Sequence, residues 1–145
     1  MSIIGAIEQA RSSGDFNAFV QAVPYARFLG ISVEERDGAL YGRMKFADHL
    51  VGNPTLPALH GGTLAALLEL ASQFELIWRA ETIVLPKTVT ITVDYLRSAK
   101  ARDTFVRANI VRQGRRVTTV VAHAWQEDEH KPVARATANM LILGK

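Results

Sequence analysis

The chain has 145 residues, of which 48% are hydrophobic and 21% are charged. This length suits one domain with a sizeable core, and this composition excludes an intrinsically disordered chain. Because the sequence contains no cysteine, disulfides, thiolate metal sites and a cysteine nucleophile are excluded as well. We therefore expect a single domain over residues 1–145, in which residues 1–29 form a helical lead.

The charged residues argue against several classes of partner. The net charge is +3, from 17 basic and 14 acidic residues, and the longest basic run is Arg115-Arg116. Charges spread in this way do not predict a nucleic-acid partner. The histidines lack metal-ligand spacing, so we expect no metal. The N-terminus lacks a signal-peptide pattern and the apolar stretches are too short for a membrane span, which predicts a cytoplasmic protein without a membrane partner.

The first part of the chain combines helical spacing with a hairpin pattern. Apolar residues recur at helical intervals before Pro24, and two alternating stretches flank a glycine turn after it. The expected elements are helical structure over 2–23, a short helix over Tyr25–Leu29 ended by Gly30, strands over Ile31–Glu35 and Ala39–Phe46 joined by a turn over 36–38, and a loop over 47–60.

The second part contains the clearest helix, from Gly61 to about Arg79. It is apolar almost all round, which is typical of a helix enclosed by other structure. After Pro86 the apolar period becomes two, which predicts a strand. Strict alternation places Thr88, Thr90, Thr92 and Asp94 on one face and Val89, Ile91, Val93 and Tyr95 on the other. Three further strands are expected over 104–112, 117–126 and 133–143.

The order of these elements indicates an α+β fold with one antiparallel sheet and one central helix. The last four strands follow each other through short links, which favours antiparallel neighbours. A single sheet of this kind leaves an edge strand and a face exposed. We therefore expect the chain to pair with a second copy as a homodimer, or as a homotetramer built from two dimers.

Glu69 is the first candidate for chemistry, because its neighbours along the predicted helix are apolar. An ionised carboxylate is seldom buried without a partner, since the loss of hydration costs several kcal/mol. The wheel positions beside Glu69 are small or polar, among them Gly62 and Gln73. Either a buried Arg or Thr hydroxyl pairs with Glu69, or Glu69 is a functional acid or base with a shifted pKa.

His60-Gly61-Gly62 stands where the predicted helix begins. Without side chains, the two glycines leave the first free N–H groups of the helix accessible, and these donors carry the positive end of the helix dipole. Such donors suit an oxyanion or a polarised carbonyl oxygen. The alternative is a flexible joint between loop and helix, since glycine also permits tight turns.

The pattern H-G-G-x-x-x-x-x-x-E, which joins His60 to Glu69, resembles a known family. It is similar to the phenylacetate-degradation (PaaI) type of acyl-CoA thioesterase, in the 4-hydroxybenzoyl-CoA thioesterase-like superfamily. The segments YARFLGI (Tyr25–Ile31) and TVTITVDYLRSA (Thr88–Ala99) extend the resemblance over nearly the whole chain. It implies a hotdog fold, in which the sheet wraps around the central helix, and hydrolysis of acyl-CoA to free acid and CoA.

The resemblance also implies roles for the motif. Glu69 would act as general base or nucleophile, and the N–H of Gly62 or Gly61 would polarise the thioester carbonyl. His60 would orient a neighbouring loop amide or lie near the leaving sulfur. The spacing of Gly62 and Glu69, roughly 10 Å along the axis, would allow both to act within one helix. The family arrangement instead takes the glycine from one subunit and the Glu from its partner, and we follow the family. It implies no metal, and no cofactor beyond the CoA of the substrate.

Further residues are candidates for substrate contacts. Asn53 resembles a loop Asn or Gln that contacts the substrate, and Thr88 matches a strand Ser or Thr that holds the attacking water, an ordinary strand threonine being the alternative. CoA phosphates need cationic and backbone partners. The candidates for binding substrate or CoA are Gly61, Gln73, Arg97, Arg115 and Arg116, with Lys100 and Arg102 as further cations near strand ends.

Two other functions stay open at this stage. The stretch His49-Leu-Val-Gly-Asn-Pro-Thr-Leu-Pro57 resembles the H-x-x-G-N-P-x-x-P loop of acyl-ACP dehydratases, in which His and a helix Glu share the acid–base work. In those enzymes the Glu follows the second Pro more closely than Glu69 follows Pro57 here, which favours hydrolysis over hydration. A non-catalytic acyl-CoA-binding module would share the same pocket.

Overall fold

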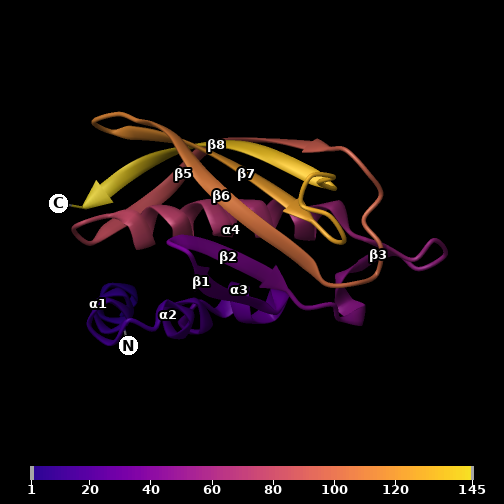
Figure 1. Ribbon diagram of the computed structural model, residues 1–145, viewed down its shortest axis with the longest axis horizontal. Helices are drawn as coiled ribbons and strands as arrows, with labels where there is room; N and C mark the ends of the chain where they lie inside the picture. Colours follow the sequence, from indigo (N-terminus) through magenta and orange to yellow (C-terminus); the bar gives the residue numbers. More distant parts are fainter. Residues whose placement is uncertain (1, 145) are drawn as a thin grey trace.

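A computed structural model describes residues 2–144, and it places one long helix against a curved antiparallel sheet (Figure 1). Three short helices precede the sheet. The elements are α1 (Ile3–Ser13), α2 (Phe16–Ala22), α3 (Pro24–Leu29), β1 (Ile31–Arg36), β2 (Ala39–Met44), a 3-10 turn η1 (Asp48–Leu50), β3 (Val51–Asn53), β4 (Ala58–Leu59), α4 (Gly61–Arg79), β5 (Val84–Tyr95), β6 (Thr104–Gln113), β7 (Val117–Trp125) and β8 (Ala134–Gly144).

The main sheet has the strand order β1-β2-β6-β7-β8-β5, and each neighbouring pair is antiparallel. This arrangement, with α4 packed against β5, β6, β7 and β8, confirms the predicted hotdog fold. The predicted bounds of the central helix are also confirmed. Residues 47–60, expected to be a loop, additionally contain η1 and the small β3–β4 hairpin.

Helix α4 lies close to the sheet because the two strands beneath it carry small side chains. The buried face of β7 and β8 consists largely of fully buried alanines, which leave room for the larger side chains of the helix. The alanines are Ala122, Ala124, Ala134, Ala136 and Ala138. Although α4 is itself apolar, no helix within residues 2–144 combines the length and the hydropathy that a membrane crossing needs.

The two edges of the sheet differ. At the β1 edge, the Asn17 side chain of α2 accepts the Val33 N–H (2.9 Å), and the Gln21 side chain donates to the Ile31 carbonyl (2.9 Å). These side chains occupy backbone groups that another strand would otherwise use. At the β5 edge no further strand is paired within residues 2–144. The open edge of the sheet is therefore that of β5.

Strand β5 departs from its prediction in two ways. It begins at Val84 and includes Pro86, which an edge strand tolerates because one side of its backbone needs no partner. A bulge interrupts its pairing with β8 between Thr88 and Thr90. Thr88 lies opposite the buried Met140, whereas Thr90 lies opposite Asn139 on the outer face. The predicted shared face for Thr88 and Thr90 is thus wrong, because the extra residue Val89 shifts the alternation.

Candidate active site

His60 is the N-cap of α4, and its ring already binds one of the amides predicted to hold a carbonyl. Its Nδ1 accepts the Gly62 N–H at 2.8 Å. An imidazole nitrogen that accepts a hydrogen bond carries no proton, so the neutral ring carries its proton on Nε2. His60 therefore cannot serve as a base through either nitrogen while it caps the helix, and Gly62 is not a free donor.

Gly61 presents the free amide of this helix end. No acceptor within residues 2–144 is hydrogen-bonded to its N–H. Its carbonyl accepts a hydrogen bond from the Tyr95 hydroxyl (2.9 Å) at the end of β5. The sequence did not indicate this role of Tyr95, because the contact depends on β5 returning alongside α4 until its last residue reaches the start of the helix.

The segment before the helix is fixed by backbone contacts. The His60 N–H donates to the Leu50 carbonyl (2.8 Å), and the Leu59 N–H donates to the Ala99 carbonyl (3.0 Å). Gly52 lies so close to this segment that a Cβ there would stand 2.7 Å from the His60 Cα. Asn53 is exposed, and its side chain accepts the Thr55 N–H (3.0 Å), which shapes its own loop and not the helix start.

Glu69, Gln73 and Thr88 lie together halfway along α4. The Gln73 side chain donates to the Thr88 hydroxyl (3.3 Å), and Glu69 stands one helical turn before Gln73. All three side chains are half-buried. Within residues 2–144 the Glu69 carboxylate has no hydrogen bond or ion pair. The bulge at Val89 creates this group, because it turns Thr88 toward the helix.

The deeply buried carboxylate of α4 is Glu75, which sequence reasoning did not single out. Its side chain is 5% exposed and pairs with Arg79 at 2.7 Å. Burial raises the pKa of Glu75 above its ordinary value, while the hydrogen bond and charge of Arg79 and the charge of Arg107 act in the opposite direction. The expected deep burial of Glu69 is therefore a feature of Glu75, and Glu69 is more accessible.

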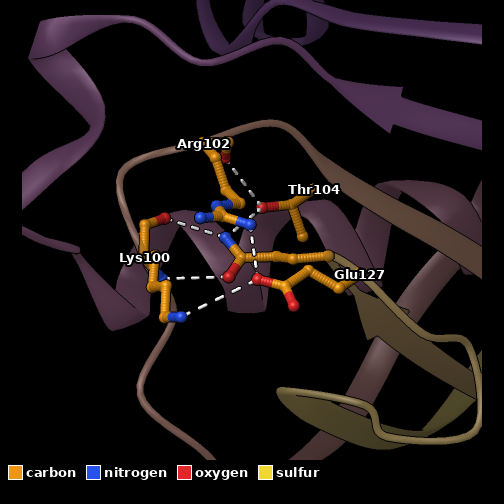
Figure 2. Close-up of polar contacts among 5 residues, drawn as sticks. Lys100, Arg102, Thr104 and Glu127 are labelled. Atoms are coloured by element: carbon orange, nitrogen blue, oxygen red, sulfur yellow. Dashed lines mark hydrogen bonds and ion pairs between the residues drawn. The ribbon is translucent and has the colours of Figure 1, made fainter.

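A basic cavity of about 350 Å³ lies beside the start of α4. Its cations are Arg97, Lys100 and Lys131, and its anions are Glu127 and Asp128. Glu127 is bound by Lys100 (3.7 Å) and by Arg102, as Figure 2 shows. The cavity borders the helix start because Ala58 forms a β-bridge with Lys100 and because Arg97 follows Tyr95 closely in the chain.

Hydrogen bonds of Gln126 and Arg97 to the backbone fix one wall of this cavity. The Gln126 side chain accepts the Lys100 N–H (3.0 Å) and donates to the Lys100 carbonyl (2.8 Å). Arg97 donates to the Pro132 carbonyl (2.7 Å). By contrast, Arg115 and Arg116 lie in the turn between β6 and β7. This turn is at the left end of the sheet in Figure 1, whereas α4 begins at the right. Gln113, just before that turn, lines a cavity with Arg79 at the other end of α4. The structure does not bring these two arginines to Gly61.

Comparison with known families identifies one domain type. The model of the acyl-CoA thioesterase N-terminal domain matches residues 52–141. The match begins just before Asn53 and includes α4 and the strands that follow it. It therefore contains His60, Gly61, Glu69, Thr88 and Tyr95.

Individual proteins are also similar to this chain in sequence or structure. The medium/long-chain acyl-CoA thioesterase YigI of Salmonella typhimurium is 28% identical over 139 residues, covering 86% of this chain and 88% of that protein. A crystal structure of a Chromobacterium violaceum protein is 33% identical with a TM-score of 0.77, covering 95% of this chain and 96% of that one. A phenylacetic acid degradation-related protein of Ralstonia eutropha is 28% identical with a TM-score of 0.74, covering 87% and 98%.

Proposed function

Because this chain belongs to the acyl-CoA thioesterase family, and is a thioester hydrolase, we propose that it cleaves acyl-CoA to a free acid and coenzyme A with Gly61 and Glu69 at the reacting carbon. One observation carries the proposal: among residues 2–144, neither the Gly61 N–H at the start of α4 nor the Glu69 carboxylate on the same helix has a hydrogen-bond partner. The relatives named YigI act on medium and long acyl chains. Such chains are therefore the first substrates to test.

Gly61 and Glu69 do not act on the same thioester within one chain. Eight residues of α-helix separate them by roughly 12 Å along the axis and by about 80° around it. A thioester carbonyl held by the Gly61 N–H is thus out of reach of the same chain's Glu69. We infer that a second copy pairs at the open β5 edge and that Glu69 of one copy faces Gly61 of the other. Because a two-fold axis relates the two copies, the dimer has two identical sites of this kind.

The half-buried polar group around Glu69 suits hydrolysis. A water molecule between the Glu69 carboxylate and the Gln73 and Thr88 side chains would be oriented for attack on the carbonyl carbon. Glu69 then removes the proton from that water as a general base, or attacks the carbonyl itself as a nucleophile. Single-turnover hydrolysis in H2(18)O tests the nucleophilic route. Water that attacks the Glu69 carbonyl of the mixed anhydride leaves its label in the Glu69 side chain, whereas the general-base route puts label only in the free acid.

The basic cavity is the best candidate for the phosphates of CoA. Arg97, Lys100 and Lys131 outnumber Glu127 and Asp128, so an anion gains net attraction there. Its position beside the helix start leaves the pantetheine arm to extend from the cavity toward Gly61. Arg115 and Arg116 are left out of this part of the proposal because they lie at the opposite end of α4.

The experiment that tests the proposal is thiol release from a panel of acyl-CoA substrates, using a matched pair of variants. Proline is tolerated at the first helical position and lacks an N–H, so Gly61→Pro removes the donor while keeping the helix start. Gly61→Ala adds the same Cβ against Tyr95 but retains the N–H. We expect kcat of Gly61→Pro to be about 100-fold below that of Gly61→Ala. Equal rates would exclude Gly61 as the donor.

Mixed assemblies test the shared site. Gly61→Pro and Glu69→Gln should each be inactive alone, but a refolded equimolar mixture should recover about a quarter of wild-type activity, because half of the dimers are mixed and each contains one intact site. A mixture as inactive as its parents would contradict a site made of two copies. The products formed by the wild type decide between hydrolysis and hydration. If it hydrates a 2-enoyl thioester and releases no thiol, the proposed hydrolysis is wrong.

The dehydratase alternative finds no support at His49. Its Nε2 is bound to the Phe28 carbonyl (2.8 Å) at the end of α3, and its ring lies against the Phe28 ring at 4.7 Å between centroids. This histidine is thereby held by the helical lead and not by a contact with Glu69 of the same chain.

A further inference from the structure

We propose that Tyr95 is a positioning residue for catalysis: together with His60 it holds the Gly61–Gly62 peptide at both ends, and so restrains the backbone at Gly61, whose N–H belongs to the preceding peptide. This inference rests on the proposed function of Gly61 as carbonyl donor. It assigns a role to Tyr95, which the motif H-G-G-x-x-x-x-x-x-E does not include.

The contacts of two consecutive peptide units define the arrangement. In the Gly61–Gly62 unit, the carbonyl accepts the Tyr95 hydroxyl (2.9 Å) and the N–H donates to His60 Nδ1 (2.8 Å). Because a peptide unit is planar, fixing both its oxygen and its hydrogen fixes its orientation. The carbonyl and the N–H of this peptide unit are therefore both held by side chains.

The preceding unit, His60–Gly61, is held at one end. Its carbonyl accepts the Thr63 N–H (3.0 Å) and the Thr63 hydroxyl (2.6 Å). In a trans peptide the N–H points opposite to the carbonyl. Since this carbonyl points into the helix, the Gly61 N–H points outward from the helix end. It is the one group of the two peptide units that no described residue binds.

The two glycines leave room for the two rings that enclose them. A Cβ on Gly61 would stand 3.2 Å from Cε1 of Tyr95, and a Cβ on Gly62 would stand 2.9 Å from Nδ1 of His60. Both distances are shorter than ordinary van der Waals contact. The glycines thus let Tyr95 and His60 approach the backbone, in addition to leaving the N–H accessible.

The bulge in β5 is what brings Tyr95 to this place. After Val89 the helix-facing residues of β5 are Ile91, Val93 and Tyr95, of which Val93 lies opposite the buried Ala136. One bulge therefore turns both Thr88 and Tyr95 toward α4, at the two positions where the strand meets Gln73 and Gly61. Without it, strict alternation would place Thr88 and Tyr95 on opposite faces of the sheet.

Removal of the Tyr95 hydroxyl should lower kcat without weakening substrate binding. Tyr95→Phe keeps the ring but removes the side-chain hydrogen bond to the Gly61 carbonyl, which keeps only its place in the helix. The backbone at Gly61 is then held less firmly when charge develops on the thioester oxygen. We expect kcat to fall about 10-fold, less than for complete loss of the donor, with KM within twofold of wild type. Tyr41→Phe is the matched control, because the Tyr41 hydroxyl contacts Arg107 (3.2 Å) and not Gly61.

A double-mutant cycle separates positioning from a structural or direct role. In the Gly61→Pro background the donor is absent, so adding Tyr95→Phe should leave kcat unchanged. An equal 10-fold loss in that background would show that Tyr95 acts on the substrate directly or through stability, and would overturn the inference. Wild-type kcat in Tyr95→Phe, alongside an impaired Gly61→Pro, would overturn it too. An inactive wild type would instead refute the proposed function.

The hydrogen bond from the Gly62 N–H to His60 is tested by a conservative replacement of His60. Asparagine is a favoured N-cap whose side-chain oxygen also accepts a first-turn N–H, whereas alanine offers no acceptor. His60→Ala should lower kcat, and His60→Asn should restore most of it at unchanged KM. If His60→Asn is as impaired as His60→Ala while both stay folded, the imidazole has a role other than holding the Gly62 amide. That result would contradict the role inferred for His60.

Discussion

Helix α4 carries two glutamates in opposite surroundings, and the difference distinguishes the carboxylate that we propose for catalysis from one with a structural role. Glu75 is 5% exposed and is satisfied by Arg79 of the same helix. Glu69 is half-buried, with no partner within residues 2–144, and lies beside the Gln73–Thr88 hydrogen bond next to the open β5 edge. A carboxylate that its own chain leaves unpartnered is available to water, substrate or a second copy. A carboxylate already paired is not.

The largest expected effect comes from neutralising each glutamate in turn. Glu69→Gln should lower kcat for acyl-CoA about 1,000-fold or more, since it removes the proposed base or nucleophile, and should leave thermal unfolding near that of wild type. Glu75→Gln should keep kcat within about threefold. Thiol-release kinetics and thermal melts of both variants check the comparison. Comparable losses of kcat in the two variants would remove the distinction drawn between them.

A smaller effect is expected from removing the partner of Glu75. Arg79→Met leaves the buried carboxylate without its ion pair, and we expect the free energy of unfolding to fall by about 1–2 kcal/mol at pH 8, a discounted value because Arg79 is itself half exposed. The loss should shrink in acid, where Glu75 takes up a proton. Urea unfolding at both pH values measures it.

An exposed ion pair provides the control for this prediction. Glu34 and Arg36 lie 2.7 Å apart with side chains 62% and 52% exposed. Arg36→Met should therefore change the free energy of unfolding by less than about 0.5 kcal/mol. If Arg79→Met is no more destabilising than Arg36→Met, burial of Glu75 does not make its pairing important.

The sequence predicted the main elements because their signals are local. The helix from Gly61 to Arg79 follows from a long apolar run after two glycines, and the last three strands follow from alternation and short turns. The start of β5 was missed, since a proline usually interrupts a strand and Pro86 is tolerated by its position at the sheet edge. That position is a property of the whole sheet.

The sequence proposed candidate residues for the site but not their contacts. His60, Gly61 and Glu69 were proposed from the motif and its resemblance, yet the choice of Gly61 over Gly62 as free donor depends on the rotamer of His60. Tyr95 and Thr88 depend on the bulge at Val89, which strict alternation does not foresee. Glu75 with Arg79 has the spacing of an ordinary surface pair, so its burial gave no signal in the sequence.

The smallest effect expected is the pH dependence that Glu75 contributes to stability. Its pKa in the folded protein is raised above the ordinary 4.5, so the folded state binds the proton more tightly than the unfolded state. The stabilisation is then complete below the unfolded pKa and is lost as the pH rises through the folded pKa. Relative to Glu75→Gln, the wild type should thus lose unfolding free energy over this window and show no further change above it. Urea titrations from acid to pH 8 measure the difference, and a difference that grows in the wild type's favour with pH would mean that Arg79 outweighs burial.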